Sequence, residues 1–182
     1  MFSERGYAGT TFQEVADRAD LTRPAINHYF SDKRALYREV IVRSNELFLA
    51  TSGVEEAQRE TTLAGRLTVF ITHAMRSNLE NPGASAFMIT SFVEPQRCPE
   101  LAGLDHEPVR LRREFLSWAV NDAIERGEFA SDIDSGALVE ALLSLFCGVG
   151  LYAGYLRNPD AMEAIIGTLR QLLGGTVRAH ER

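Results

Sequence analysis

Apolar residues recur at helical spacing along almost the whole chain, and no stretch alternates convincingly between apolar and polar residues with a period of two. Phe12, Val15, Ala16 and Ala19, for example, form one stripe at i, i+3, i+4 and i+7. The chain has 182 residues, enough for one ordinary core or for a small module joined to a larger one. The pattern therefore predicts an all-α fold.

The charge is divided unevenly along the chain. The formal net charge of -6 excludes a uniformly basic nucleic-acid-binding protein. Residues 1–50 carry seven Lys/Arg and seven Asp/Glu, which leaves 12 Lys/Arg against 18 Asp/Glu for residues 51–182. We therefore predict two modules with a boundary near residue 50, and expect any polyanionic partner to meet the first of them.

Two short helices joined by a tight turn are predicted near the N-terminus. A capping box beginning at Thr11 opens the first helix. The helical pattern is interrupted at Asp20, a residue that tolerates left-handed backbone better than most. Thr22 is a good N-cap for the second helix, and Pro24 lies in its first turn, where a missing N–H costs little. This helix is expected to end near Phe30. The arrangement is typical of a helix-turn-helix.

The second of these helices has a polar outer face. Leu21 and Ile26 are expected to point back into a small core. The remaining side chains have a size and polarity that reach base edges in a major groove: Thr22, Arg23, Asn27 and His28. We favour Arg23 and Asn27 for base readout, because guanidinium and carboxamide groups can each read a purine edge through two hydrogen bonds.

Several sequence elements occur together over about residues 2–41: FSERGY, the TT that opens the next helix, EVADRA, HYF and SDKRAL. In their type and spacing they resemble the DNA-binding signature of the TetR family. The resemblance implies that base and phosphate contacts come from Thr22, Arg23, Pro24, Asn27, His28 and Tyr29. It also implies backbone-phosphate contacts from Thr11 and Lys33, and helix N-termini and lysines do attract phosphate. Core packing for Tyr29 and a solvated, non-contacting role for His28 are the alternatives.

The segment departs from the family pattern at its start. Family members carry a full helix before the FSERGY-like segment, whereas this sequence begins with Met1 and Phe2. Because that helix covers the next two, Phe12, Val15 and Ile26 are expected to be partly bare, and burying each such side chain is worth about 1.5–3 kcal/mol. The alternative function is therefore a helical ligand-binding or scaffolding module without effective DNA binding.

A very apolar helix is predicted from Ser135 to Arg157, followed by a last helix that Asn158 and Pro159 open. The uncharged run from Ala141 to Leu156 is shorter than the roughly 20 residues of a membrane span, so we expect a helix buried in protein. Small residues let another helix approach closely: Gly148, Gly150 and Gly154. We predict a symmetric homodimer packed through residues 135–173, as the resemblance also implies, with core helices of a monomer as the alternative.

The resemblance implies a ligand cavity among the middle helices. Candidate ligand-binding side chains there are Phe70, His73, Phe87, Met88, Phe92, Phe115, Trp118 and Tyr152. An apolar cavity with a few polar groups would accept a small apolar or amphipathic effector, although such a set is also typical of plain core. The expected function is a ligand-responsive regulator, usually a repressor in this family, that binds a palindromic operator as a homodimer and is released by its effector.

The sequence gives no indication of an enzyme. It has no Gly-rich phosphate loop and no nucleophile elbow, so we predict no catalytic residue and no cofactor. No metal site is predicted, because the candidate ligands are not at metal-binding spacing: His28, His73, His106, His180, Cys98 and Cys147. The N-terminus does not resemble a signal peptide, and a cytoplasmic location is expected.

Overall fold

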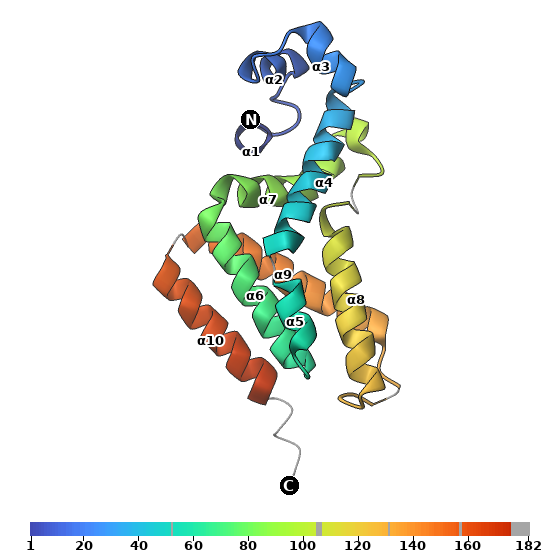
Figure 1. The fold of residues 1–182 in the computed structure, drawn as a ribbon, viewed down its shortest axis with the longest axis vertical. Helices are drawn as coiled ribbons and strands as arrows, with labels where there is room; N and C mark the ends of the chain where they lie inside the picture. The colour runs from blue at the N-terminus through green and yellow to red at the C-terminus, as the bar shows by residue number, and fades with distance from the viewer. Residues whose placement is uncertain (52, 105–106, 131, 157, 176–182) are drawn as a thin grey trace. The chain divides into compact units, whose positions relative to one another are not determined.

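The computed structural model describes residues 1–51, 53–104, 107–130, 132–156 and 158–175, so His106 and His180 lie outside the described residues. All regular elements in these ranges are helices (Figure 1). The predicted all-α fold is confirmed. None of the helices in the described ranges is long and apolar enough to cross a membrane.

The helices follow one another with short connections. Their bounds are α1 Phe2–Arg5, α2 Phe12–Arg18, α3 Arg23–Tyr29, α4 Lys33–Thr51, α5 Val54–Arg59, α6 Leu63–Glu80, α7 Pro82–Arg97, α8 Arg110–Glu125, α9 Ser135–Leu156 and α10 Pro159–Gly175. Two short 3-10 helices, η1 at Pro99–Leu101 and η2 at Glu107–Val109, lie between α7 and α8. Of these elements, α5 has no counterpart in the sequence-based prediction.

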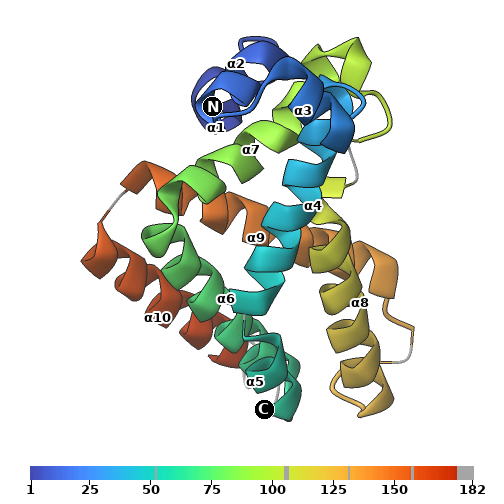
Figure 2. The same cartoon turned by 45° about the horizontal axis from the view of Figure 1, so that its top comes forward.

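The chain forms two compact units. The first contains Met1–Leu47 and Pro82–Pro108, and the second contains Phe48–Asn81 and the chain from Val109 onward. The long helix α4 therefore contributes residues to both units. In the first unit α7 lies beside α1 (Figure 2), so a segment from the middle of the chain joins the helix-turn-helix. The sequence did not indicate this association.

The core of the first unit covers the inner faces of α2 and α3. Phe12 and Ile26 are only 6% and 3% exposed, so the expectation that they would be partly bare is wrong. They are buried in one cluster whose members come from α1, α2, α3, α4, α7, η1 and the neighbouring turns: Phe2, Tyr7, Phe12, Ala16, Ile26, Leu36, Tyr37, Ile41, Phe87, Leu101 and Leu104. Val15 is half-buried, as expected, and lines a groove of about 460 Å³.

The turn between α2 and α3 has the predicted geometry. Asp20 adopts the left-handed conformation with φ 54°, and the Thr22 hydroxyl accepts a hydrogen bond from the backbone N–H of Ala25 at 3.3 Å. The residue types also predict that Ser31 caps the helix after α3 and that Pro95 begins a loop, and both predictions are wrong. Asp32, not Ser31, caps α4, because its Oδ1 accepts from the Ala35 N–H at 2.7 Å. Helix α7 continues through Pro95 and ends two residues later, at Arg97.

The second unit is built around an aromatic cluster. Phe70 of α6 stacks on Phe115 of α8, with ring centroids 4.4 Å apart and an interplanar angle of 11°. Phe146 of α9 and Phe48 of α4 meet the Phe70 ring edge-on at 5.1 and 5.6 Å. Helix α10 lies along α6 in both ribbon views (Figures 1 and 2). Aromatic burial from several helices therefore holds this unit together.

Candidate nucleic-acid interface

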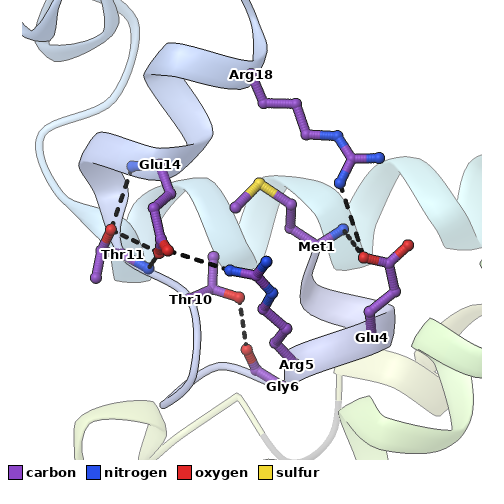
Figure 3. A network of polar contacts seen from close by, with 8 residues as sticks. All are labelled: Met1, Glu4, Arg5, Gly6, Thr10, Thr11, Glu14 and Arg18. Atoms are coloured by element: carbon purple, nitrogen blue, oxygen red, sulfur yellow. Dashed lines mark hydrogen bonds and ion pairs between the residues drawn. The ribbon is translucent and has the colours of Figure 1, made fainter.

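Helix α2 begins with a complete capping box at Thr11 (Figure 3). The Thr11 hydroxyl accepts from the Glu14 N–H at 3.2 Å, and Glu14 Oε2 accepts from the Thr11 N–H at 2.9 Å. Arg5 donates to Glu14 Oε1 at 3.1 Å. The hydrogen bonds from Thr11, followed by the charge of Arg5, hold the pKa of Glu14 below its ordinary value. Thr11 is exposed at the positive end of α2, and its contact with a DNA phosphate stays a prediction.

Helix α3 buries one side and exposes the other. Ile26 faces the core and Leu21 packs against it, as predicted. All predicted contact residues on this segment are exposed: Thr22, Arg23, Pro24, Asn27, His28 and Tyr29. The alternative of core packing for Tyr29 is wrong, since this residue is 69% exposed. The helix therefore presents a continuous polar and aromatic face of the kind that enters a major groove.

The exposed side chains of α3 that are candidates for DNA contact differ in the contacts that they make within the protein. The Arg23 guanidinium lies 4.7 Å from the centroid of the Phe12 ring, a cation–π contact that connects α3 to α2. Asn27 lies one turn further along α3 and is exposed. The rings of His28 and Tyr29 meet edge-on at 5.5 Å. Contact of each of these side chains with DNA stays a prediction.

Lys33, at the start of α4, is bound within the first unit. Its Nζ donates to the backbone carbonyl of Tyr7 at 3.0 Å and lies 4.0 Å from the centroid of the Tyr7 ring. The ammonium therefore fixes the segment before α2. A phosphate contact from Lys33 stays a prediction, and it would have to form beside this existing hydrogen bond.

Tyr7 is a structural residue that the sequence analysis missed. It is buried, and its backbone N–H donates to Glu94 Oε2 of α7 at 2.6 Å. Burial, together with a hydrogen bond to the Glu100 side chain, raises the pKa of Tyr7 to about 12. Glu94 lies 87 residues from Tyr7 in sequence. No local pattern indicates so distant a partner.

Comparison with known proteins agrees with this geometry. Residues 1–40 match the profile of "Bacterial regulatory proteins, tetR family". The chain is 39% identical to the HTH-type transcriptional activator FasR of Mycolicibacterium smegmatis, over 96% of this chain and 77% of FasR. The chain belongs to the TetR family. It is therefore a DNA-binding transcriptional regulator with an N-terminal helix-turn-helix and a helical C-terminal domain.

Other TetR-family proteins match along nearly the full length. The HTH-type transcriptional regulator UidR of Escherichia coli is 25% identical over 98% of this chain and 88% of UidR. The solved structure of FadR from Bacillus subtilis in complex with stearoyl-CoA has a TM-score of 0.76 at 15% identity, covering 94% of this chain and 91% of FadR. At that identity the likeness concerns the fold alone.

The eight predicted ligand-binding residues of this TetR-family chain do not all belong to one unit. Phe87, Met88 and Phe92 lie on α7 in the first unit. The other five lie in the second unit: Phe70, His73, Phe115, Trp118 and Tyr152. Phe87 is part of the core that supports the helix-turn-helix, with its ring 5.4 Å from that of Tyr37 and 6.3 Å from that of Phe2.

His73 and Tyr152, two of the five residues in the second unit, lie in different surroundings. His73 Nε2 lies 2.8 Å from Glu56 Oε2, and the imidazole packs against Gly53, whose φ of 65° also favours glycine. Tyr152 is half-exposed on α9, where it lines a shallow apolar groove together with Leu145 and Gly148. Ligand contact stays a prediction for both residues.

Two buried arginines in the second unit were also missed. Arg66 hydrogen bonds Asp122, donates to the Glu60 carbonyl at 3.1 Å and lies 4.4 Å from the centroid of the Trp118 ring. Arg112 lies 3.9 Å from the centroid of the Phe48 ring, and burial lowers the pKa of Arg112 to about 10. Within the part of the chain that the structure describes, no group of His, Cys, Asp or Glu side chains could hold a metal ion.

Proposed function

We propose that this TetR-family protein is a ligand-responsive repressor, which binds a palindromic operator as a homodimer and is released by a small apolar or amphipathic effector. The observation that carries the DNA-binding part is the orientation of α3. Ile26 anchors the helix to the core, while Arg23 and Asn27 remain exposed on its outer face. A recognition helix needs this division between a packed face and a base-reading face.

The DNA test begins with selection of bound duplexes from a randomised library, followed by fluorescence anisotropy on the selected sequence. We expect a palindromic sequence, and an affinity that falls as salt rises, because phosphate contacts release counterions. Replacing Arg23 or Asn27 with alanine is expected to cost about 1–3 kcal/mol and to relax specificity at one base position. The control is Arg59→Ala, which removes an exposed arginine of α5 in the second unit.

The alternative function, a helical ligand-binding or scaffolding module, gives a different result. The library then yields no enriched duplex. The wild type, Arg23→Ala and Arg59→Ala proteins all bind DNA equally weakly. Enrichment of a sequence without two-fold symmetry would contradict the palindromic operator.

The homodimer is supported by apolar surface on α9. Leu145, Leu151 and Tyr152 are 36%, 54% and 51% exposed. Leu145 and Tyr152 border an apolar groove of about 340 Å³, and a Cβ built on Gly148 beside it meets nothing within 4 Å. Large apolar side chains around an open glycine suit the close approach of a second copy of the same helix.

Light scattering coupled to size-exclusion chromatography tests this dimer. Leu145→Glu and Tyr152→Glu each place a charge on the proposed interface and are expected to give a monomer. Val93→Glu is the matched control, since Val93 is a similarly exposed apolar residue on α7 in the first unit. A dimer that persists in both α9 variants would contradict the proposed interface.

The effector is supported by the aromatic composition of the second unit and by the stearoyl-CoA complex of FadR. Trp118 is the single tryptophan of the chain, so its fluorescence reports on this unit without interference. We expect titration with stearoyl-CoA to change Trp118 emission and to release the selected duplex over the same concentration range. Emission that changes while the duplex stays bound would contradict release by that effector.

The direction of regulation is tested separately. The expression of a reporter gene placed behind the selected operator should fall when the protein is present. It should recover when the cells receive the fatty acid from which they form stearoyl-CoA. The relative FasR is named an activator. A rise in reporter expression would overturn repression while leaving DNA binding intact.

A further inference from the structure

Both backbone polar groups of Tyr7 are hydrogen bonded to charged side chains. Its backbone N–H donates to Glu94 Oε2 at 2.6 Å, and its carbonyl accepts from Lys33 Nζ at 3.0 Å. The partners come from α7 and α4, so two elements converge on the loop that precedes α2. This loop leads directly into α2.

Glu94 also fits the loop by shape. Gly6, the neighbour of Tyr7, has φ 69°, and a Cβ added there would collide with the Glu94 carboxylate. A second connection starts at Arg34, the next residue of α4 after Lys33, which donates to the carbonyls of Glu100 and Ala102 at 2.8 and 2.9 Å. Charged side chains therefore hold the loop to α4 and α7, and the chain after α7 to α4, and such charge-assisted hydrogen bonds are stronger than neutral ones.

We propose that Glu94 is a positioning residue for DNA binding: by accepting the Tyr7 N–H it fixes the loop at Gly6–Thr11, and thereby the orientation of the helix-turn-helix. The inference rests on the proposed function, because the orientation matters only if α3 reads DNA. Glu94 itself makes no contact with DNA in this proposal. Its effect on DNA affinity acts through Tyr7.

Hydrogen–deuterium exchange of the full-length protein tests the connection without DNA. Glu94→Ala removes the acceptor, and the peptide that contains Tyr7 is expected to exchange about tenfold faster. Glu94→Gln retains an amide oxygen at the same place and should restore most of the protection. Gln96→Ala is the control on the same helix, because the Gln96 side chain donates to a carbonyl of α7 itself, that of Phe92, at 3.4 Å. Equal exchange in the Glu94→Ala and Gln96→Ala variants would overturn the proposal.

Anisotropy on the selected duplex and on unrelated duplex DNA gives the second readout. Glu94→Ala is expected to lower affinity for the selected duplex about tenfold while changing affinity for unrelated DNA little, since phosphate contacts remain. Glu94→Gln should recover the specific affinity to within about threefold, because the hydrogen bond to Tyr7 is kept. Equal loss in both variants, or equal loss on both DNAs, would overturn the positioning role.

The two failures are distinguishable. If the wild-type protein selects no duplex, the proposed function fails, and the exchange experiment alone decides whether Glu94 fixes the loop. If the wild-type protein selects a duplex and Glu94→Ala binds it normally, the proposed function stands and the positioning role of Glu94 is rejected.

Discussion

The guanidinium of Arg23 lies over the face of the Phe12 ring, 4.7 Å from its centroid. Phe12 is the first residue of α2 and Arg23 the first residue of α3, so a buried aromatic side chain of one helix supports an exposed cation of the next. A long side chain that is held in place loses less rotamer entropy when it binds. Phe12, a core residue of the helix-turn-helix, therefore directly contacts Arg23, a candidate for base readout.

Phe12→Leu should weaken operator binding without abolishing it. Leucine keeps an apolar side chain in the core but removes the ring face under Arg23, a contact worth about 0.5–1 kcal/mol at an exposed site. We expect a roughly two- to fivefold loss of affinity by anisotropy. In the Arg23→Ala background the same Phe12→Leu change should have no further effect on affinity. A full additive loss there would show that Phe12 acts without Arg23.

The capping box at Thr11 predicts a measurable loss of stability. Thr11→Ala removes the acceptor of the Glu14 N–H and is expected to lower the free energy of unfolding by about 1 kcal/mol in urea titrations. Gln13→Ala, on the exposed side of α2, is the control. A loss no larger than that of the control would contradict the capping role.

The lowered pKa of Glu14 predicts that its contribution to the free energy of unfolding depends on pH in the acid range. A carboxyl group whose folded pKa lies below its ordinary value of 4.5 contributes stability above that pH, and this contribution is lost as pH falls through the folded pKa. The difference in unfolding free energy between wild type and Glu14→Gln should therefore shrink as pH falls below 4.5. A constant difference down to the acid transition would contradict this assignment.

The raised pKa of Tyr7 predicts the opposite dependence at alkaline pH. Because the folded protein holds this proton up to about pH 12, against 10.0 for a free tyrosine, the contribution is present below pH 10.0 and lost as pH rises toward 12. Tyrosinate absorbance should show a group that titrates near pH 12 in the wild type and is absent in Tyr7→Phe. Titration of this group near pH 10 would mean that Tyr7 is solvated.

The Tyr37 hydroxyl predicts a gain in stability on removal. Tyr37 is 1% exposed, and its hydroxyl has no hydrogen-bond partner among the described residues. Tyr37→Phe should raise the free energy of unfolding by about 1 kcal/mol, because a buried polar group without a partner costs desolvation energy. Tyr7→Phe, which removes a hydroxyl whose pKa is raised by burial and by hydrogen bonding to Glu100, should change the free energy of unfolding in the other direction. Loss of stability in Tyr37→Phe would reveal a partner for its hydroxyl.

Local chemistry predicted the helix-turn-helix well. The cap at Thr22, the left-handed Asp20 and the buried Ile26 all follow from side chains within a few residues of the feature that they determine. The prediction of helix ends was less accurate where two neighbouring residues can both cap the helix. Ser31 and Asp32 are both good caps, and the carboxylate of Asp32 is the one that reaches the Ala35 N–H.

Long-range packing could not be predicted from such patterns. The helices nearest in sequence predict a partly bare Phe12, whereas Phe87, Leu101 and Leu104 complete the cluster from more than 70 residues away. Glu94 likewise resembles any polar residue near the end of a helix. Its role is visible only because folding brings it to the Tyr7 N–H.

The first unit is assembled from two separate stretches of chain, Met1–Leu47 and Pro82–Pro108. A hybrid regulator made by transplanting residues 1–50 onto a foreign sensor would leave Phe87, Leu101 and Leu104 behind. The donor module would then arrive with part of its interior open to water and with the Tyr7 amide deprived of Glu94. Engineers who wish to retarget this protein should therefore exchange the exposed residues of α3 in place and leave the rest of the chain intact.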